Sequence, residues 1–336
     1  MTKEYVMKRL AALGFTLLVS TAATAAVAGT PSFQKQGGKA KFINGDNLVT
    51  GVYAETATPA DTRLQSPQQK AAGLSAVMVT RNGDQYVSSA SAEDVALFEE
   101  AIKAMELLGR LPHSVPGTPP TRSTGDGAGR AVPNVVIGTD ERFPVTTTTN
   151  APYWHIGRIG IGCTGTLIGP KHVLTAGHCV SDGAGNWYSS LDFTVAQNGS
   201  YQPWGTATWA RAITTTAWLN NGDSNYDYAL IVLSTAPHGG NAGWGTYSGG
   251  THTITGYPGD KPFGTMWSAS GGVSTSGSYR LCYTIDTSGG NSGSGIYDSG
   301  YVVRGVHTTG SSSQNCGTRL TSTVFNTLQN WIADNP

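Results

Sequence analysis

Three short segments hold residue types that together can perform nucleophilic catalysis. His178 lies in LTAGHC, Asp227 in YDYAL and Ser292 in GGNSGS. A serine hydroxyl is a poor nucleophile at neutral pH and needs a base, and the base needs an acid that fixes its tautomer. Singly, a strand-end histidine, a capping aspartate or a loop serine is more often structural. Their occurrence together and in this order favours a triad of base, orienting carboxylate and nucleophile.

The glycines beside Ser292 add a second chemical element. Glycine lets backbone N–H groups approach an oxyanion that develops at a reacting carbonyl. The amides of Gly290 and Ser292 are the predicted donors, and such donors contribute about 3 kcal/mol each to transition-state binding.

These residues need a scaffold of strands. From residue 131 onward the chain consists of short β-prone runs broken by Gly, Asn and Pro, which is typical of an antiparallel sandwich or barrel. We expect strands at 156–161, 165–168, 172–175, 228–233, 253–256 and 301–307. Helical spacing is confined to the end of this domain, at 322–332.

The N-terminus predicts export. An apolar run, Leu10 to Val19, is too short to span a bilayer, and small residues after it offer cleavage after Ala25 or Ala28. Three basic residues precede the run: Lys3, Lys8 and Arg9. We interpret residues 1–28 as a signal peptide of a secreted, extracellular protein without a membrane anchor. The alternative is an anchor or a buried helix.

Residues 29–130 differ from the rest and predict a small α+β unit. Ser91 to Asp94 resembles a capping box and opens a run with helical spacing. Two strands, 74–80 and 86–87, flank an Asn-Gly turn. Residues 111–130 are rich in Pro, Gly, Ser and Thr and form a linker. We interpret 29–130 as a propeptide with its linker, removed by proteolysis. A permanent N-terminal domain is the alternative.

Charge and cysteine content narrow the class of protein. The chain has 21 Lys and Arg and 21 Asp and Glu, so it offers no electrostatic case for nucleic acid or an acidic membrane as a partner. Four cysteines in an exported chain favour two disulfides. A zinc site is the alternative, but C-x-x-C and paired-histidine spacings are absent from the sequence. We expect no required cofactor and no metal; structural calcium has no loop motif to support it.

The three segments resemble those of the chymotrypsin-like serine proteases. The chain is more closely similar to the bacterial glutamyl endopeptidases over residues 135–331. The stretches that carry this resemblance are VIGTDER (136–142), CTGTLI (163–168), NYDY (225–228), GYPGDK (256–261) and GVH (305–307). The resemblance implies an all-β domain at 131–336 with two antiparallel six-stranded β-barrels and a short C-terminal helix. It also implies a disulfide between Cys163 and Cys179, which leaves Cys282 and Cys316 as the second pair.

The resemblance further implies a secreted, monomeric serine endopeptidase that works through an acyl-enzyme on protein and peptide substrates, with its own propeptide as a partner before processing. In the family, a histidine and a hydroxyl residue five positions before the nucleophile bind a substrate glutamate. His307 and Thr287 occupy these positions. A protonated imidazole suits an anion, so we expect cleavage after Glu and more weakly after Asp. The alternative places His307 as a packed strand residue.

Two residues depart from this pattern or compete with it. Asp286 lies where trypsin-like enzymes hold the aspartate that binds Lys or Arg, so a trypsin-like specificity is the alternative if its carboxylate faces the pocket. Asn291 replaces the aspartate that pairs with the new N-terminus in trypsin-like zymogens. We therefore expect the mature N-terminus, at Ala131 or at Asn134 or Val135, to lie near the primary pocket instead.

Two rival classes remain. A lipase or esterase would need the order Ser, Asp, His and alternating helices, and Ser294 breaks the G-x-S-x-G elbow. A catalytically inactive binding protein of this fold usually lacks a triad member, and here all three residue types are present.

Overall fold

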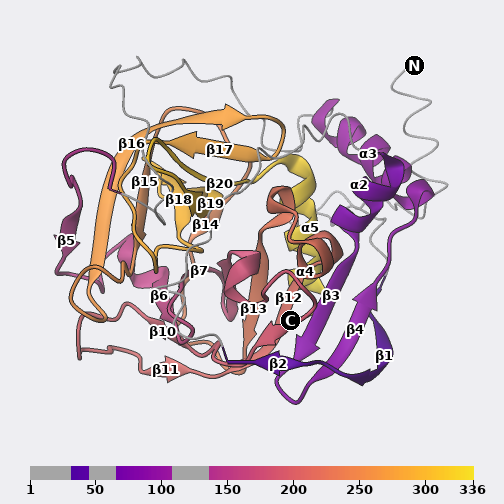
Figure 1. Ribbon diagram of the computed structural model, residues 1–336, viewed down its shortest axis with the longest axis horizontal. Coiled ribbons are helices and arrows are strands. Elements are labelled where there is room, and N and C mark those ends of the chain that lie inside the picture. The colour runs from indigo at the N-terminus through magenta and orange to yellow at the C-terminus, as the bar shows by residue number, and fades with distance from the viewer. Residues whose placement is uncertain (1–31, 45–65, 108–135) are drawn as a thin grey trace.

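The computed structural model describes residues 32–44, 66–107 and 136–336, and the account below covers these ranges. The expected signal peptide and the expected linker at 111–130 lie outside them. Residues 32–44 and 66–107, called here the N-terminal segment, lie beside one end of the larger domain (Figure 1). The domain itself is built on two β-sheets, as the alternating apolar runs predict.

The first sheet contains ten strands in the order β1-β4-β3-β12-β13-β8-β7-β6-β10-β11. Six of them correspond to the first expected barrel, and short β11 (Thr206–Ala207) extends it at one end. The six are β6 (Ile156–Ile159), β7 (Thr164–Gly169), β8 (His172–Thr175), β10 (Phe193–Val195), β12 (Trp209–Thr215) and β13 (Ala229–Leu233). Two further short strands, β2 (Phe42–Ile43) and β9 (Trp187–Tyr188), pair in parallel beside it.

The second sheet closes on itself. Strand β19 pairs with both β18 and β20, so six strands form a ring, and β14 (Gly243–Trp244) and β5 (Phe143–Val145) attach to it. The ring consists of β15 (Thr251–Gly256), β16 (Met266–Ser276), β17 (Arg280–Tyr283), β18 (Gly295–Asp298), β19 (Val302–Gly310) and β20 (Asn315–Arg319). The expected architecture of two six-stranded barrels is confirmed.

Two helices belong to the domain. The expected C-terminal helix is α5 (Ser322–Ala333); the Thr321 side chain caps its start, and the helix buries its own Leu328 and Trp331 side chains. Helix α4 (Thr216–Asn221) was not expected, because six residues give too little periodicity to recognise. Its end signals are nevertheless local: Thr215 accepts the N–H of Trp218, and Gly222 ends the helix with a φ of 59°.

The N-terminal segment has the expected mixed α and β character. The strand pair β3 (Ala76–Thr80) and β4 (Asp84–Ser88) flanks the predicted turn, and helix α3 (Ala92–Leu107) begins at the predicted cap. There the Ser91 hydroxyl accepts the N–H of Asp94, whose carboxylate accepts the N–H of Ser91. Strand β1 (Gln34–Lys39) and helix α2 (Pro67–Leu74) were not expected.

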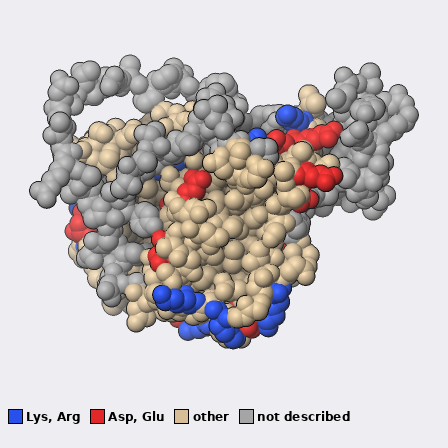
Figure 2. Space-filling view, turned by 45° about the vertical axis from the view of Figure 1, so that its right-hand side comes forward, with Lys and Arg blue, Asp and Glu red and all other residues tan. Residues whose placement is uncertain are grey.

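The visible surface agrees with the low charge of the chain. On the face in Figure 2, most of the described surface is neither basic nor acidic, and Lys and Arg gather mainly at its lower edge. Across the described ranges, we find no helix that combines the length and the apolar character needed to cross a membrane.

Candidate active site

The first barrel presents His178 at the end of β8. The strand ends at Thr175, and a single 3-10 turn, Gly177–Cys179, carries the histidine. A Cβ on Gly177 would lie 2.7 Å from the Trp218 ring, so the close approach of this turn to helix α4 requires glycine. The His178 side chain is almost fully buried and lies beside the Trp218 ring.

Asp227 holds His178 through both oxygens of its carboxylate. Its Oδ2 lies 2.9 Å from Nδ1 of the histidine ring, and its Oδ1 accepts the backbone N–H of His178 at 2.9 Å. Asp227 is fully buried. A carboxylate at Nδ1 favours the tautomer in which Nδ1 carries the proton and Nε2 can accept one. The two residues therefore have the geometry of a base and its orienting acid.

The Asp227 backbone is fixed by threonine hydroxyls that sequence reasoning missed. They hold three successive carbonyls: Thr215 bonds Tyr226 (3.3 Å), Thr318 bonds Asp227 (2.9 Å) and Thr214 bonds Tyr228 (2.9 Å). The first and third belong to β12 and the second to β20, so both barrels contribute. No local motif marks these threonines, because their partners are distant in sequence.

Ser292 lies on a turn of the second barrel that presses against the first. Gly293 has a φ of 85°, and a Cβ on it would lie 2.1 Å from Thr175 Oγ1 and 2.2 Å from the Thr164 carbonyl. The Ser292 carbonyl accepts the N–H of Thr164 at 2.8 Å. The glycine that follows the expected nucleophile is thus what lets it approach the strand that leads to His178.

Gly290 also occupies a position that excludes a side chain. Its φ is 100°, and a Cβ would lie 2.4 Å from the carbonyl oxygen of Tyr257. The Gly290 carbonyl accepts the Thr164 hydroxyl at 2.8 Å, which anchors this turn to the first barrel. The turn is therefore rigidly placed; the roles of the Gly290 and Ser292 amides as oxyanion donors stay predictions.

His307 lies directly behind this turn. Its backbone N–H bonds the Ser294 carbonyl, and its carbonyl accepts the N–H of Gly293, both at 2.8 Å. The ring is completely buried. Burial, together with the neighbouring charges of His178 and Arg280, lowers the pKa of His307 to about 3, although the Cys316 carbonyl opposes the shift. In the free protein the ring is neutral near pH 7, which differs from the protonated imidazole expected from sequence.

The neighbour of this ring at Nδ1 is Tyr283. The Tyr283 hydroxyl lies 2.6 Å from Nδ1 of His307, and burial raises the pKa of Tyr283 well above its ordinary value. The hydroxyl therefore keeps its proton and can donate a hydrogen bond to Nδ1; in the His307 tautomer that accepts this bond, the ring N–H is at Nε2. Neither His307 Nε2 nor the buried Thr287 hydroxyl has a hydrogen-bond partner among the described residues. Buried polar atoms of this kind usually have partners.

Asp286 does not offer a free carboxylate to a ligand. Its Oδ1 accepts the N–H of Ile137 at 2.7 Å, and its Oδ2 accepts the N–H of Glu141 at 2.8 Å. The residue is 4% exposed. Both oxygens thus hold the segment that leads into β5, which is a different use from the binding of a substrate Lys or Arg.

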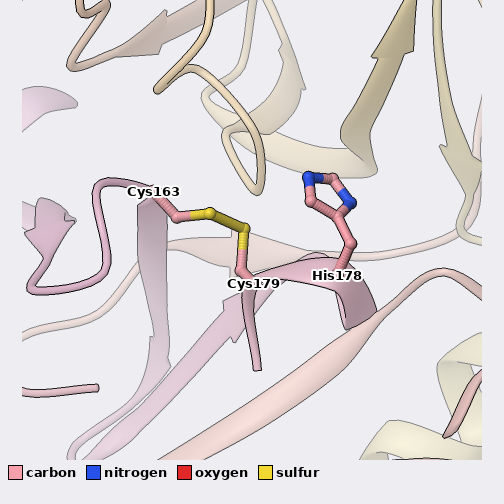
Figure 3. Close-up of side chains that lie close together, drawn as sticks. All are labelled: Cys163, His178 and Cys179. Carbon is pink, nitrogen blue, oxygen red and sulfur yellow. A yellow bond between two sulfur atoms is a disulfide. The ribbon is translucent and has the colours of Figure 1, made fainter. Parts of the chain in front are cut away.

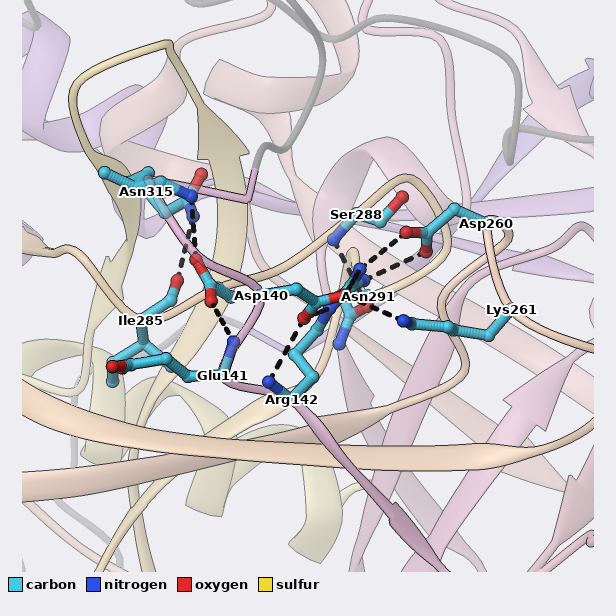
Figure 4. Close-up of polar contacts among 11 residues, drawn as sticks. Asp140, Glu141, Arg142, Asp260, Lys261, Ile285, Ser288, Asn291 and Asn315 are labelled. Atoms are coloured by element: carbon cyan, nitrogen blue, oxygen red, sulfur yellow. Dashed lines mark hydrogen bonds and ion pairs between the residues drawn. The ribbon is translucent and has the colours of Figure 1, made fainter.

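An ion cluster at Asp140 and Arg142 fastens the same segment. Arg142 bonds the carboxylates of Asp140 and Asp260, and Lys261 bonds Asp140 (Figure 4). The guanidinium of Arg142 holds the pKa of Asp140 well below its usual range. Figure 4 places this cluster beside the turn that leads to Asn291. In the sequence, these residues belong to two of the stretches that resemble the glutamyl endopeptidases, VIGTDER and GYPGDK. That they form ion pairs with one another is evident only in the structure.

Both disulfides have the pairing that the resemblance implies. Cys163 is bonded to Cys179, next to His178 (Figure 3), and Cys282 is bonded to Cys316 across the neighbouring strands β17 and β20. The first bridge therefore ties the histidine turn to the start of β7, and the second braces the barrel wall near His307.

Comparison with known proteins identifies relatives over this domain. The family described as trypsin-like peptidase domain matches residues 163–306. A glutamyl endopeptidase of Bacillus licheniformis is 43% identical over 218 residues, which cover 58% of this chain and 68% of that protein. A Bacillus subtilis protein named extracellular metalloprotease is 39% identical over 220 residues, which cover 59% of this chain and 70% of that protein.

A solved structure agrees with these relatives. It is titled as a Glu endopeptidase in complex with MPD and superposes with a TM-score of 0.56 at 35% identity, covering 59% of this chain and all of that one. The matched share is close to that of residues 136–336, so the similarity lies in the two-barrel domain.

The name of the Bacillus subtilis relative raises the question of a metal. Among the described residues, the one group that could hold an ion is Cys163, His178 and Cys179, whose candidate ligand atoms lie within 4.8 Å of one another. Both sulfurs are joined in a disulfide, and Nδ1 of the histidine is engaged by Asp227. A cysteine ligates zinc as a thiolate, which a disulfide does not supply, so this donor set does not fit a metal.

Proposed function

The chain belongs to the trypsin-like serine peptidases, among the relatives of the bacterial glutamyl endopeptidases, and from that premise we propose that it cleaves peptide bonds after glutamate, and more weakly after aspartate. The observation that carries the specificity is the buried ring of His307, which lies behind the Ser292 turn with the Tyr283 hydroxyl 2.6 Å from its Nδ1. The observation that carries the chemistry is the doubly bonded Asp227–His178 pair.

The bond-breaking step follows from that pair. The Ser292 hydroxyl attacks the carbonyl carbon of the substrate while His178 Nε2 takes its proton, and Asp227 stabilises the imidazolium that forms. The oxyanion that develops accepts hydrogen bonds from the backbone N–H groups of Gly290 and Ser292. His178 then gives the proton to the leaving amine as the C–N bond breaks. Water attacks the acyl-enzyme with His178 again as base, which releases the acid and restores Ser292.

Glutamate recognition rests on buried hydrogen-bond donors. His307 presents an N–H at Nε2, and Thr287 presents a hydroxyl, and both are buried. A carboxylate supplies acceptors for them, and hydrogen bonds to a charged acceptor are stronger than neutral ones. A bound carboxylate also favours the protonated imidazole, so glutamate binding raises the pKa of His307. Asp286 does not compete for this role, because backbone amides occupy both its oxygens.

The test uses matched peptides that differ only in the residue before the scissile bond: Glu, Gln, Asp, Arg and Phe. We expect Glu to exceed Gln, its neutral isostere, by at least tenfold in kcat/KM, since loss of a charge-assisted bond costs about 1.5–3 kcal/mol. A serine-directed inhibitor and Ser292→Ala should abolish all cleavage. Preference for Arg would assign the binding of the substrate side chain to Asp286 instead of His307. No cleavage of any peptide by the processed, folded protein would support an inactive binding protein.

We further propose export and maturation. Residues 1–28 act as the signal peptide, residues 29–130 are removed, and the domain at 131–336 works outside the cell as a monomer on peptides and proteins. The anchoring of Ile137 and Glu141 by Asp286 supports a fixed start of the domain beside the pocket. N-terminal sequencing of the secreted protein tests this. A start between Ala131 and Val135 is expected, and a start far upstream of Arg130 would rule out a propeptide.

A further inference from the structure

The N-terminal segment extends the first barrel by strand addition. Strand β3 pairs with β12 in antiparallel register, with Val77 opposite Thr214 and Ala76 opposite Thr215, and β4 and β1 follow β3 outward (Figure 1). Ala76 is fully buried in this contact. Without β3, β12 would be an edge strand with open backbone donors and acceptors.

Strand β12 is also the strand that fixes the backbone around Asp227. The hydroxyls of Thr214 and Thr215 bond the carbonyls on either side of this residue, at Tyr228 and Tyr226. The two threonines are the ones that face Val77 and Ala76 across the ladder. The segment is therefore one strand away from the carboxylate that orients His178.

Helix α2 makes a second, closer contact with the same loop. A Cβ on Gly73 would lie 2.2 Å from the Tyr226 ring, so the helix and the residue before Asp227 meet without any spare space. The Ser75 carbonyl, just past the helix end, accepts the first N–H of helix α4, from Thr216, at 2.9 Å. Helix α4 in turn carries Trp218, against which the His178 turn packs.

Contacts at the far end of the segment hold it in place. Arg81 forms an ion pair with Asp192 at 2.8 Å and lies over the Trp209 ring. Backbone bonds and a ring contact add to it: Arg81 N–H to the Ala210 carbonyl, Trp187 N–H to the Lys41 carbonyl, and Phe42 against Trp209.

From these contacts we infer that the N-terminal segment is a positioning unit for Asp227, which stays docked on β12 after the linker is cut, until the segment is itself removed, and does not act as a plug of the active site. It holds Tyr226 from behind through Gly73 and holds Thr214 and Thr215 through β3. Gly73 is a positioning residue in this scheme. The kinetic test of this inference rests on the proposed peptidase function. The docking of the segment can be measured without any peptidase activity.

The first experiment follows the segment. A recognition site for an unrelated protease is inserted between residues 108 and 135 of the full chain, the linker is cut, and the product is examined by native mass spectrometry. We expect the segment and the domain to remain one complex until mild denaturant separates them. Release on cutting alone would overturn the inference, whatever the peptidase assay gives.

The second experiment measures what the docked segment does. The Gly73→Ala variant places a methyl group against Tyr226, and Gly37→Ala is the matched control, because a Cβ there meets nothing within 4 Å. In the cut, docked complex we expect Gly73→Ala to lower kcat roughly tenfold with KM little changed, since small displacements of catalytic groups are costly in rate. Gly37→Ala should match the unsubstituted complex.

Removal of the segment separates positioning from a general folding defect. After removal, the Gly73→Ala and unsubstituted preparations contain the same domain, so the difference in kcat should vanish. A difference in kcat that persists after removal would contradict the inference. So would a severalfold rise in the kcat of the unsubstituted enzyme on removal, because such a rise is the behaviour of an inhibitor.

A structural readout covers the case in which Gly73→Ala fails to fold. In the unsubstituted complex, amide hydrogen exchange in residues 209–215 should be slow while the segment is docked and faster after its removal. Unchanged exchange would contradict strand addition on β12.

Discussion

The Tyr283 hydroxyl, from β17, lies 2.6 Å from Nδ1 of His307, from β19 of the same barrel. Burial keeps the proton on Tyr283, so the hydroxyl can donate to Nδ1 of the histidine. In the tautomer that accepts this bond, Nε2 is the ring nitrogen that can donate to a ligand.

Removal of the Tyr283 hydroxyl should reduce the discrimination between Glu and other substrate residues and leave the bond-breaking step intact. We expect Tyr283→Phe to lower the ratio of kcat/KM for Glu over Phe peptides about tenfold, the equivalent of one lost hydrogen bond to a buried group. The control is Tyr247→Phe, which removes the bond from another buried tyrosine of this barrel to the Val273 carbonyl at 2.6 Å. It should cost similar stability and leave the ratio unchanged. Equal ratios in all three proteins would remove Tyr283 from the specificity mechanism.

The low pKa of His307 predicts a pH dependence of stability. The folded pKa is about 3, below the ordinary 6.5, so between these values the unfolded chain binds the extra proton. The free energy of unfolding should therefore fall as the pH falls from 6.5 toward 3, by up to about 1.4 kcal/mol per pH unit from this group. Urea unfolding at a series of pH values should show a shallower slope for His307→Gln than for the unsubstituted protein; parallel curves would contradict the assignment.

Asp286 should matter for stability and not for the choice of substrate. Asp286→Asn replaces one of the two oxygens that accept backbone N–H groups by an NH₂ group, which faces a donor. We expect a loss of about 1–3 kcal/mol in the free energy of unfolding, the cost of an unsatisfied buried donor. Cleavage after Arg should stay as low as in the unsubstituted enzyme. A change in the Glu-to-Arg ratio would show that the carboxylate does reach the pocket.

The ion cluster gives a comparison of a buried and a more exposed cation. The Arg142 side chain is 2% exposed and bridges two carboxylates, whereas the Lys261 side chain is 20% exposed, pairs with Asp140 and lies over the Trp267 ring. Arg142→Met should destabilise by about 3 kcal/mol or more, since two carboxylates lose a buried partner. Lys261→Met should cost less than about 1 kcal/mol. Thermal unfolding in matched buffers measures both, and equal losses would contradict this account.

The orienting acid has a kinetic signature. Asp227→Asn keeps the shape of the residue but can donate to Nδ1, which favours the wrong tautomer of His178. In a Ser-His-Asp triad such a change lowers kcat by about 10⁴-fold. We expect a similar fall here, with KM little affected. Circular dichroism should confirm that the variant is folded. A fall of less than tenfold in a folded variant would remove Asp227 from the triad.

Much of this domain could be predicted from local sequence. The apolar runs at β8 and β13, the cap of α3 and the helical spacing of α5 depend on neighbours a few residues away, so propensity and periodicity reveal them. The segments around His178, Asp227 and Ser292 are equally local, and so the sequence alone indicated the type of chemistry.

Only the tertiary structure decided how distant residues share their polar groups. The partners of Asp286 are more than 140 residues away, and the protonation of His307 depends on burial by both its own strand and its neighbours. Residue types leave these choices open, because an aspartate at that position could equally face a pocket. Likewise, the strand pattern of the N-terminal segment predicts a hairpin, but its place on β12 follows from long-range backbone pairing that no local signal encodes.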